Sequence, residues 1–346
     1  MARVAKAGRE AFLLEHGKEN GRHPKEFHVV EHLDRMEKRA NVLADVFGLS
    51  ELERANIYKD IQWHDVIIEY DVAGSDFLTM ITRRRGALEG DIPCGANGNE
   101  GRSALEMDKT TGLEKSRPLT KQQRESSKWA VYATYPLAEF GKKFDQFPFL
   151  AEVYKRKPNL RVFFDQLKQV GFEKGDLFSQ PHLEKPLESG SAVPREVLIT
   201  ALVDLGGAGM SDAETFFSEG NAEMRELYDN LRNPSVFQDL YEGPGRSADR
   251  ERVAAAFLKW IDSQAGFAAW QYLRFEKIVY LLAKNKQLTR QQERGLRSAF
   301  GKFQTNIRAS MERAKRVRAA FGENKSQLGE QEAFKILARE VGYKID

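Results

Sequence analysis

Residues 61–68 read Ile61-Gln62-Trp63-His64-Asp65-Val66-Ile67-Ile68. The adjacent pair His64-Asp65 places two good metal ligands inside a run that otherwise has the composition of a buried helix. An ionisable pair in apolar surroundings costs several kcal/mol unless it is compensated, and a bound cation is the most effective compensation. Histidine usage points to the same kind of site, because five of the six histidines lie in the first fifth of the chain: His16, His23, His28, His32 and His64.

Helical periodicity dominates around this run. From about Glu26 to Phe47, one stripe carries apolar residues at helical spacing: Val29, Leu33, Met36 and Ala40. Ser50 and Glu53 have the spacing of a capping box that starts a second helix, which carries Ile57, Ile61 and Ile68 inward. Positions 64 and 65 fall on that same inward face. Strand-like alternation is scarce and no hairpin signal stands out, so the sequence predicts an all-α fold.

The rest of the chain alternates helical segments with irregular stretches. Residues 86–118 are rich in glycine and polar side chains and predict a long loop, which in a compact domain is usually functional or mobile. Further helices are expected at about 121–142, at 148–170 and from 194 to a stop at Gly206-Gly207, with an irregular patch at 171–191.

A loop at 241–245 separates these segments from a last third that is helical and more basic. The sequence therefore predicts a first domain at 1–240 and a C-terminal helical extension at 246–346 that packs on it.

Composition excludes several classes of protein. A chain of 346 residues with 30% charged residues is typical of one large or two modest globular domains. Its one cysteine, Cys94, excludes an internal disulfide and a zinc site built from several thiolates. No secretory signal or membrane-spanning stretch is evident, so we expect a cytoplasmic protein without a membrane partner. A net charge of +3 is too small to imply a nucleic-acid partner by itself.

Two histidines in the first helical segment complement the doublet. His28 and His32 are four residues apart, so on a helix their side chains project from one face within about 6 Å of each other. His32 also lies on the inward stripe, between Val29 and Met36. Two antiparallel neighbouring helices joined by a short link would bring His32 to His64 and Asp65. The alternative for His32 alone is a hydrogen-bonded core histidine; the doublet on the adjacent helix favours a metal site.

This pattern resembles the HD-domain superfamily of metal-dependent phosphohydrolases, whose members carry a histidine, a later His-Asp doublet and a distant aspartate. His32 looks like the first ligand, and His64 and Asp65 match the doublet. Asp204, in Ala201-Leu202-Val203-Asp204-Leu205-Gly206-Gly207, fits the fourth ligand, since it lies near a helix end and shares a face with Val197 and Ala201. The resemblance implies an HD-domain-like helical bundle.

Two further stretches are similar to one subgroup of the superfamily, the predicted HD phosphohydrolases. They are Phe27-His28-Val29-Val30-Glu31-His32 and Asn99-Glu100-Gly101-Arg102-Ser103-Ala104. The resemblance covers roughly residues 20–230. The distance from Asp65 to Asn99 is longer than the family pattern and implies an insertion at about 72–96 beside the site. Leu202-Val203 stand where the family often has a second acidic residue, and the last third of the chain has no counterpart in the minimal domain.

The implied ligand set of two imidazoles and two carboxylates suits a divalent ion: Mn²⁺, Fe²⁺, Co²⁺, Ni²⁺, Zn²⁺ or Mg²⁺. Such a metal would activate a water and neutralise phosphoryl charge, and the substrate would be a phosphomonoester or a nucleotide-like molecule. Asp65 is expected to be both a ligand and the orienter of the water. His28 is expected to contact the substrate phosphate or to support a metal ligand, and Glu100 to orient the attacking water. The alternative interpretation is that His28 is a histidine on the helix surface and that Glu100 is a favourable charge at a helix start.

Two other functions stay open. The first is a non-catalytic HD-like scaffold that binds nucleic acid or a protein partner through its basic C-terminal helices. It is motivated by residues 290–325, which hold ten Lys and Arg against three Glu. The second keeps the metal but uses two irons for oxygen chemistry, with His28 as the nearest spare ligand.

Overall fold

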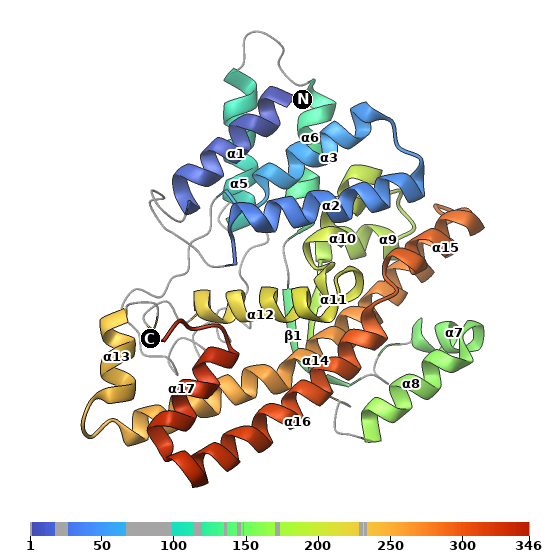
Figure 1. Ribbon diagram of the computed structural model, residues 1–346. Coiled ribbons are helices and arrows are strands. Elements are labelled where there is room, and N and C mark those ends of the chain that lie inside the picture. The colour runs from blue at the N-terminus through green and yellow to red at the C-terminus, as the bar shows by residue number, and fades with distance from the viewer. Residues whose placement is uncertain are drawn as a thin grey trace. The chain divides into compact units, whose positions relative to one another are not determined.

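The computed structural model describes residues 2–17, 27–66, 99–113, 120–134, 137–143, 147, 149–169, 174–227, 231 and 234–345. The chain divides into two compact units (Figure 1): residues 1–206 with 270–301, and residues 207–269 with 302–346. Neither range is continuous in sequence. We describe each unit by itself.

The first unit contains the following elements: α1 (Ala2–His16), α2 (Val30–Phe47), α3 (Glu51–Trp63), α5 (Asn99–Leu113), α6 (Lys121–Tyr132), β1 (Leu137–Lys143), α7 (Phe149–Arg156), α8 (Pro158–Gln169), β2 (Lys174–Ser179), α9 (Pro181–Glu188), α10 (Arg195–Asp204), the last part of α14 (Ser247–Lys284) and α15 (Arg290–Ala299). The second unit contains α11 (Gly207–Met210), α12 (Ala213–Leu227), α13 (Pro234–Glu242), the first part of α14, α16 (Phe303–Leu328) and α17 (Glu330–Glu340).

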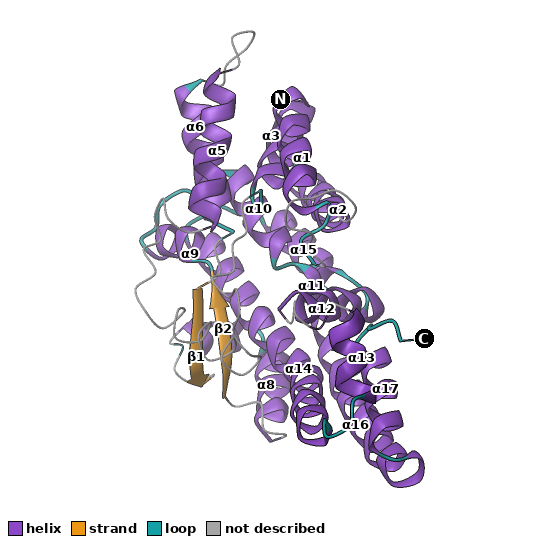
Figure 2. Ribbon diagram, turned by 90° about the vertical axis from the view of Figure 1, so that its left-hand side faces the viewer, coloured by secondary structure: helices purple, strands orange, loops and turns teal. Residues whose placement is uncertain are grey.

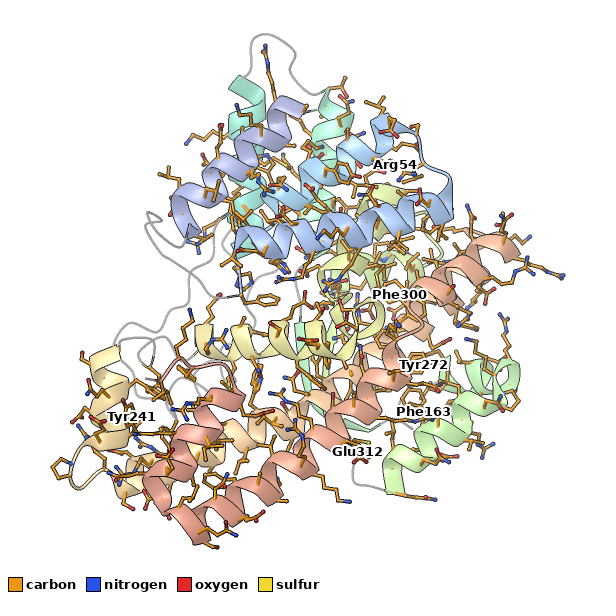
Figure 3. The ribbon with its side chains drawn as sticks, in the orientation of Figure 1. Arg54, Phe163, Tyr241, Tyr272, Phe300 and Glu312 are labelled. Atoms are coloured by element: carbon orange, nitrogen blue, oxygen red, sulfur yellow. The ribbon has the colours of Figure 1, made fainter. Side chains whose placement is uncertain are left out.

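Helix α10 lies at the centre of the first unit. It packs against α2, α3, α6 and α9, and its residues 197–203 are all buried. A helix that is apolar all round is stable only inside a core, and these neighbours supply one. Burial also confirms the stripe predicted on α2, where Leu33, Met36 and Ala40 are fully enclosed. The aromatic rings of Phe163 on α8 and Tyr272 on α14 add a smaller cluster, with centroids 6.2 Å apart (Figure 3).

The short link between α2 and α3 is built as the sequence predicts. Gly48 ends α2 in the left-handed conformation, with φ of 66°, which glycine adopts without a steric penalty. Ser50 caps α3, accepting from the Glu53 backbone N–H, while the Glu53 carboxylate accepts from the Ser50 N–H at 2.8 Å. The capping box is thus confirmed, and α2 and α3 pack against each other directly.

Two arginines tie α2 to α10. The Arg39 guanidinium donates to the carbonyl oxygen of Val203 at 3.4 Å, next to the end of α10. The Arg195 guanidinium, at the start of α10, lies over the ring of Phe47, 4.4 Å from its centroid. The two helices are therefore joined near both ends of α10.

The all-α prediction is confirmed for most of the described chain but missed one sheet. β1 and β2 form a two-stranded antiparallel sheet, shown in orange in Figure 2, with a register irregularity between Glu139 and Lys142. The sequence predicts a helix for residues 137–142, which are part of β1, and an irregular patch for 171–191, which holds β2 and α9. The two strands lie more than thirty residues apart, so their pairing leaves no local signal of the kind a hairpin gives.

Two more predictions need correction. Residues 99–113 form α5 inside the stretch predicted as a loop, because packing against α6 and α3 outweighs the glycines at 101 and 112. The domain boundary at 240–246 also differs from the observed division. α14 runs unbroken for 38 residues, so the chain passes from one unit to the other within a helix, where no loop marks the change. The insertion at 72–96 lies outside the described residues.

Among the described helices, none combines the length and the apolar character needed to cross a bilayer.

Gly8 allows α1 to approach the end of α3. A Cβ at this position would lie 2.7 Å from the indole Nε1 of Trp63 and 3.0 Å from the carbonyl oxygen of Gln62. That indole is fixed, since it is buried and donates to the carbonyl oxygen of Val4 at 2.9 Å. We expect Gly8→Ala to lower the free energy of unfolding by about 1–3 kcal/mol, the usual effect of overpacking.

The matched control is Gly322→Ala on α16, where a Cβ meets nothing within 4 Å. The same substitution there should stabilise by about 0.5–1 kcal/mol, because alanine loses less entropy in a helix. Urea unfolding of both variants measures the difference. Equal effects would contradict the close packing of α1 on α3.

Candidate metal centre

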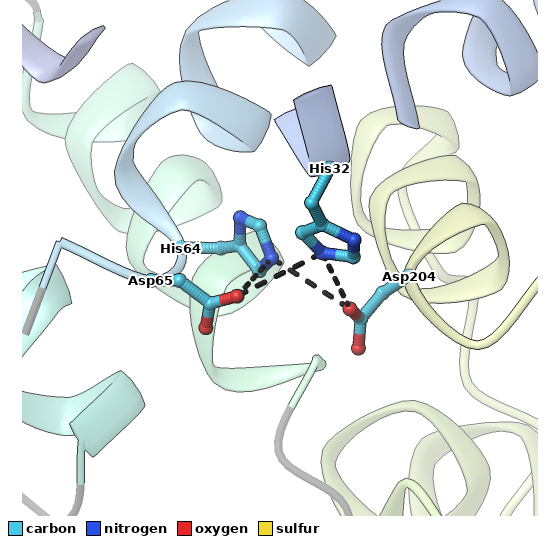
Figure 4. A group of neighbouring side chains, drawn as sticks. All are labelled: His32, His64, Asp65 and Asp204. Carbon is cyan, nitrogen blue, oxygen red and sulfur yellow. Dashed lines mark ion pairs between the residues drawn. The ribbon is translucent and has the colours of Figure 1, made fainter. Parts of the chain in front are cut away.

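Four side chains from three helices converge in the first unit (Figure 4). His32 lies in the first turn of α2. His64 is the C-cap residue of α3 and Asp65 follows it. Asp204 is the last residue of α10. The inward periodicity through Ile68 predicts that the doublet lies within a longer helix. The structure instead places it at the end of α3, and Ile68 lies outside the described residues.

The potential ligand atoms of these four residues all lie within 4.8 Å of one another. His32 Nε2 is 3.9 Å from Asp65 Oδ2 and 3.8 Å from Asp204 Oδ1. His64 Nε2 is 2.7 Å from Asp65 Oδ2 and 3.6 Å from Asp204 Oδ1. Figure 4 shows these contacts as dashed lines that cross between the two imidazoles and the two carboxylates. The geometry thus brings together the whole ligand set predicted from sequence.

The imidazole of His32 has no hydrogen bond within the described part of the chain. His32 and His64 are each 1% exposed, and neither ring nitrogen of His32 has a hydrogen-bond partner there, whereas His64 Nε2 contacts Asp65 Oδ2 at 2.7 Å. Buried polar atoms in this state carry a cost of about 1–3 kcal/mol each. A cation bound by their lone pairs would remove that cost, so the residues fit a divalent metal.

The tautomer of His64 is set by the helix that carries it. Its Nδ1 lies 2.7 Å from the carbonyl oxygen of Ile61, which can only accept, so Nδ1 carries a hydrogen and donates it. In the neutral ring, the lone pair is then on Nε2, which faces the two carboxylates. Histidines that bind metals are commonly oriented by a second hydrogen bond of this kind.

The electrostatics of the cluster favour a positive charge. Burial lowers the pKa of His32, and the neighbouring His64 adds to the effect, so His32 is a neutral imidazole. Burial opposes charge on His64 too, but Asp65 and Asp204 outweigh it and raise the pKa of His64. The carboxylates of Asp65 and Asp204 therefore stabilise a positive charge at His64, which a proton supplies when no metal is bound.

The two carboxylates are not equivalent. Burial acts to raise the pKa of Asp65, but His64 and then His28 overcome it and leave that pKa below its ordinary value. Burial raises the pKa of Asp204. The contact with His64 acts to lower that pKa, and the negative charge of Asp65 acts to raise it further. Asp65 is thus the firmly ionised member of the pair.

His28 lies beside the cluster but not on α2, which begins at Val30. Its Nε2 is 3.7 Å from Asp65 Oδ2, and its ring centroid is 6.0 Å from that of His32. The predicted proximity of the two histidines is correct, although the helical spacing used to derive it is not. Phe27 packs on both rings, with centroids 4.9 Å from His28 and 4.6 Å from His32.

Other predicted residues fall outside what is described. Glu100 is in the first turn of α5, but its side chain is outside the described part of the structure. Residues 18–26 and 67–98 are outside it as well. Ser103 and Ala104 of the same motif are fully buried on α5. His182 is half-buried, 5.8 Å from the ring of Tyr132, and does not belong to the cluster.

A buried ion pair one turn before the doublet was missed in the sequence. Lys59 and Asp60 are almost fully enclosed, with Nζ and Oδ1 3.0 Å apart, and Lys59 also donates to the Ser127 hydroxyl on α6. This pair holds the last turn of α3 against α6. The signal was available, because adjacent opposite charges precede an apolar run that contains a second charged pair.

Comparison with protein-family models, curated proteins and solved structures finds no match. The description of the centre therefore depends on its donor atoms and their geometry.

Adding a divalent metal to metal-depleted protein is expected to raise its melting temperature. The stabilisation should reach about 2.7 kcal/mol at a free metal concentration of 100 times Kd. His64→Ala and Asp204→Asn should each weaken metal binding by at least about 100-fold, since changes to mere supporting residues already cost 10–100-fold. Thermal melts with Mn²⁺, Zn²⁺ or Ni²⁺, together with metal content per chain, measure this.

His182→Ala is the control, because this histidine is half-buried but outside the cluster. It should keep both the metal content and the thermal shift. A shift that persists in both ligand variants would place the metal elsewhere.

Proposed function

We propose that this protein is a metal-dependent phosphohydrolase of the HD type, which cleaves a phosphomonoester or nucleotide-like substrate. The observation that carries the proposal is the convergence of His32, His64, Asp65 and Asp204 within 4.8 Å of one another. Their order along the chain, a histidine, a His-Asp doublet and a distant aspartate, matches the order in that superfamily. An HD-like arrangement of the helices around α10 is part of the same proposal.

A divalent cation held by these four residues would supply a Lewis acid that lowers the pKa of a water and neutralises charge on a phosphoryl group. Donor chemistry does not choose among Mn²⁺, Fe²⁺, Co²⁺, Ni²⁺, Zn²⁺ and Mg²⁺. Two ionised carboxylates and two neutral imidazoles sum to a charge of −2, which one divalent ion balances.

Asp65 has the position of the central residue of the reaction. Its Oδ2 lies within 3.9 Å of the Nε2 atoms of three imidazoles, those of His28, His32 and His64. Because its pKa is held low, it stays ionised and is suited both to bind the metal and to orient a water. His28 is the one of the three histidines outside the four-residue cluster, and we assign it to the substrate phosphate or its leaving group.

The scaffold alternative has less support. Five of the ten cations at 290–325 contact carboxylates: Arg297, Arg313, Arg316, Arg318 and Lys325. Cations paired in this way have less charge to offer to a nucleic-acid backbone. On α16, Phe303, Ile307 and Val317 are buried together with Arg313, whereas Lys315, Arg316 and Arg318 are exposed. The two-iron alternative would require two metals per chain, which metal analysis decides.

Hydrolysis of small phosphate esters and nucleotides should depend on the four-residue cluster. Asp65→Ala and His64→Ala are expected to lower kcat/KM by at least about 1,000-fold, because each removes several kcal/mol of metal-derived stabilisation. A substrate screen with released phosphate as the readout tests this, with His182→Ala as a variant expected to retain activity. Turnover undiminished in both cluster variants would rule out the proposed function.

His28→Gln separates the reaction from metal binding. The substitution should leave metal content unchanged, since His28 is outside the cluster of ligand atoms, but lower kcat by about 100-fold or more if the imidazole transfers a proton. Measurement of kcat and KM at saturating metal distinguishes this from loss of substrate affinity. Unchanged kcat together with unchanged KM would show that His28 has no part in the reaction.

A further inference from the structure

The second unit contains a polar pocket that the proposed hydrolase does not use. It has a volume of about 340 Å³ and is lined by side chains of α12, α16 and the end of α17. From α12 come residues at helical spacing, namely Glu214, Phe217, Ser218, Asn221 and Arg225. From the other two segments come Arg313, Arg316, Glu340 and Gly342.

Positive charge exceeds negative charge in the walls. Three guanidinium groups and two carboxylates line the pocket, and one of these carboxylates, that of Glu340, contacts two of the arginines. Glu340 Oε1 accepts from Arg313 Nε at 3.1 Å and lies 3.4 Å from Arg316 Nη2. Arg225 Nη1 donates to the backbone carbonyl oxygen of Val341 at 2.8 Å. Arg313 and Arg316 thus share the single carboxylate of Glu340.

Arg313 is built into the pocket rather than placed on a surface. Its side chain is 6% exposed and its guanidinium lies over the ring of Phe217, 4.8 Å from the centroid. Its Nη2 donates to the backbone carbonyl of Glu340 at 2.9 Å and to Asn221 Oδ1 at 3.4 Å. Burial lowers the pKa of the Arg313 guanidinium, although Glu340 acts to raise that pKa.

One donor of this guanidinium is unsatisfied. Arg313 Nη1 is buried and has no hydrogen-bond partner within the described ranges. A buried charged donor without a partner is expensive, and a bound water or anion would satisfy it. Gly342, with φ of +89°, gives room to the neighbouring Arg225, because a Cβ there would collide with that guanidinium. The backbone at Gly342 thus leaves space for Arg225.

We propose that this pocket is a binding site for a phosphate-type oxyanion, free or carried by a small molecule. Arginine guanidinium groups bind such anions by paired N–H donors, and three of them converge on a volume that suits a small ligand. The inference is independent of the proposed hydrolase, because every residue involved belongs to the second unit.

The test is calorimetric titration of the full chain with inorganic phosphate. Arg316→Glu is the informative variant, since this side chain is 67% exposed and its replacement should not disturb folding. The substitution removes one charge-assisted contact and reverses the charge at this position, so it should weaken phosphate binding by at least about tenfold. Arg318→Glu, two residues further on α16 and outside the pocket, is the matched control and should change the affinity less than about twofold.

Glu214→Gln gives a change of opposite sign. Glu214 lines the pocket as a carboxylate, so its neutralisation should strengthen phosphate binding. Titrations in the His64→Ala chain, after chelation of metals, exclude phosphate bound at the metal centre. The same titrations with a phosphomonoester show whether the free or the carried anion is preferred. Absence of saturable binding, equal affinities of wild type and Arg316→Glu, or weaker binding by Glu214→Gln would each overturn the proposal.

Discussion

The first unit depends on the balance of charge around Asp65. Two imidazoles that are 1% exposed lie beside two carboxylates that are 13% and 15% exposed, a group of four ionisable side chains in a helical core. Such a group is expensive in a low dielectric unless its charges cancel and its lone pairs are used. A proton on His64 cancels part of the charge, but it leaves both nitrogens of His32 without partners. A divalent cation does both, which is why we regard the cluster as a metal centre rather than a polar core.

The backbone supports the same charge. His64 and Asp204 lie at the C-terminal ends of α3 and α10, where unpaired carbonyl groups give a helix a partial negative charge. One such carbonyl, that of Ile61, orients the His64 ring. His32, in contrast, is in the first turn of α2, where the partial charge is positive and a neutral imidazole is favoured. The ends of α3 and α10 thus combine rigid attachment of ligands with a field that suits a cation, whereas the start of α2 supplies a neutral ligand.

The sequence was sufficient where the signal is local. The capping box at Ser50 and the buried stripe of α2 follow from residues a few positions apart, and the structure has both. The ligand set came from order along the chain and a family resemblance, and its four residues do meet. The failures concern long-range interactions: the pairing of β1 with β2, the burial that makes 99–113 helical, and the passage of α14 between units. The Lys59–Asp60 pair was missed because its burial depends on packing of α3 on α6.

The pocket in the second unit follows the same physical logic with the opposite sign. There, a buried guanidinium is only partly neutralised by Glu340 and keeps one donor unused, just as the imidazole of His32 in the metal centre keeps its ring nitrogens unused. A buried charge left incomplete destabilises the free chain and is offset when an ion of opposite sign binds, so an ion that binds only the folded state stabilises it. Incomplete neutralisation, rather than the mere presence of charged residues, is therefore what these two sites share, in contrast to a buried ion pair such as Arg274 with Glu184.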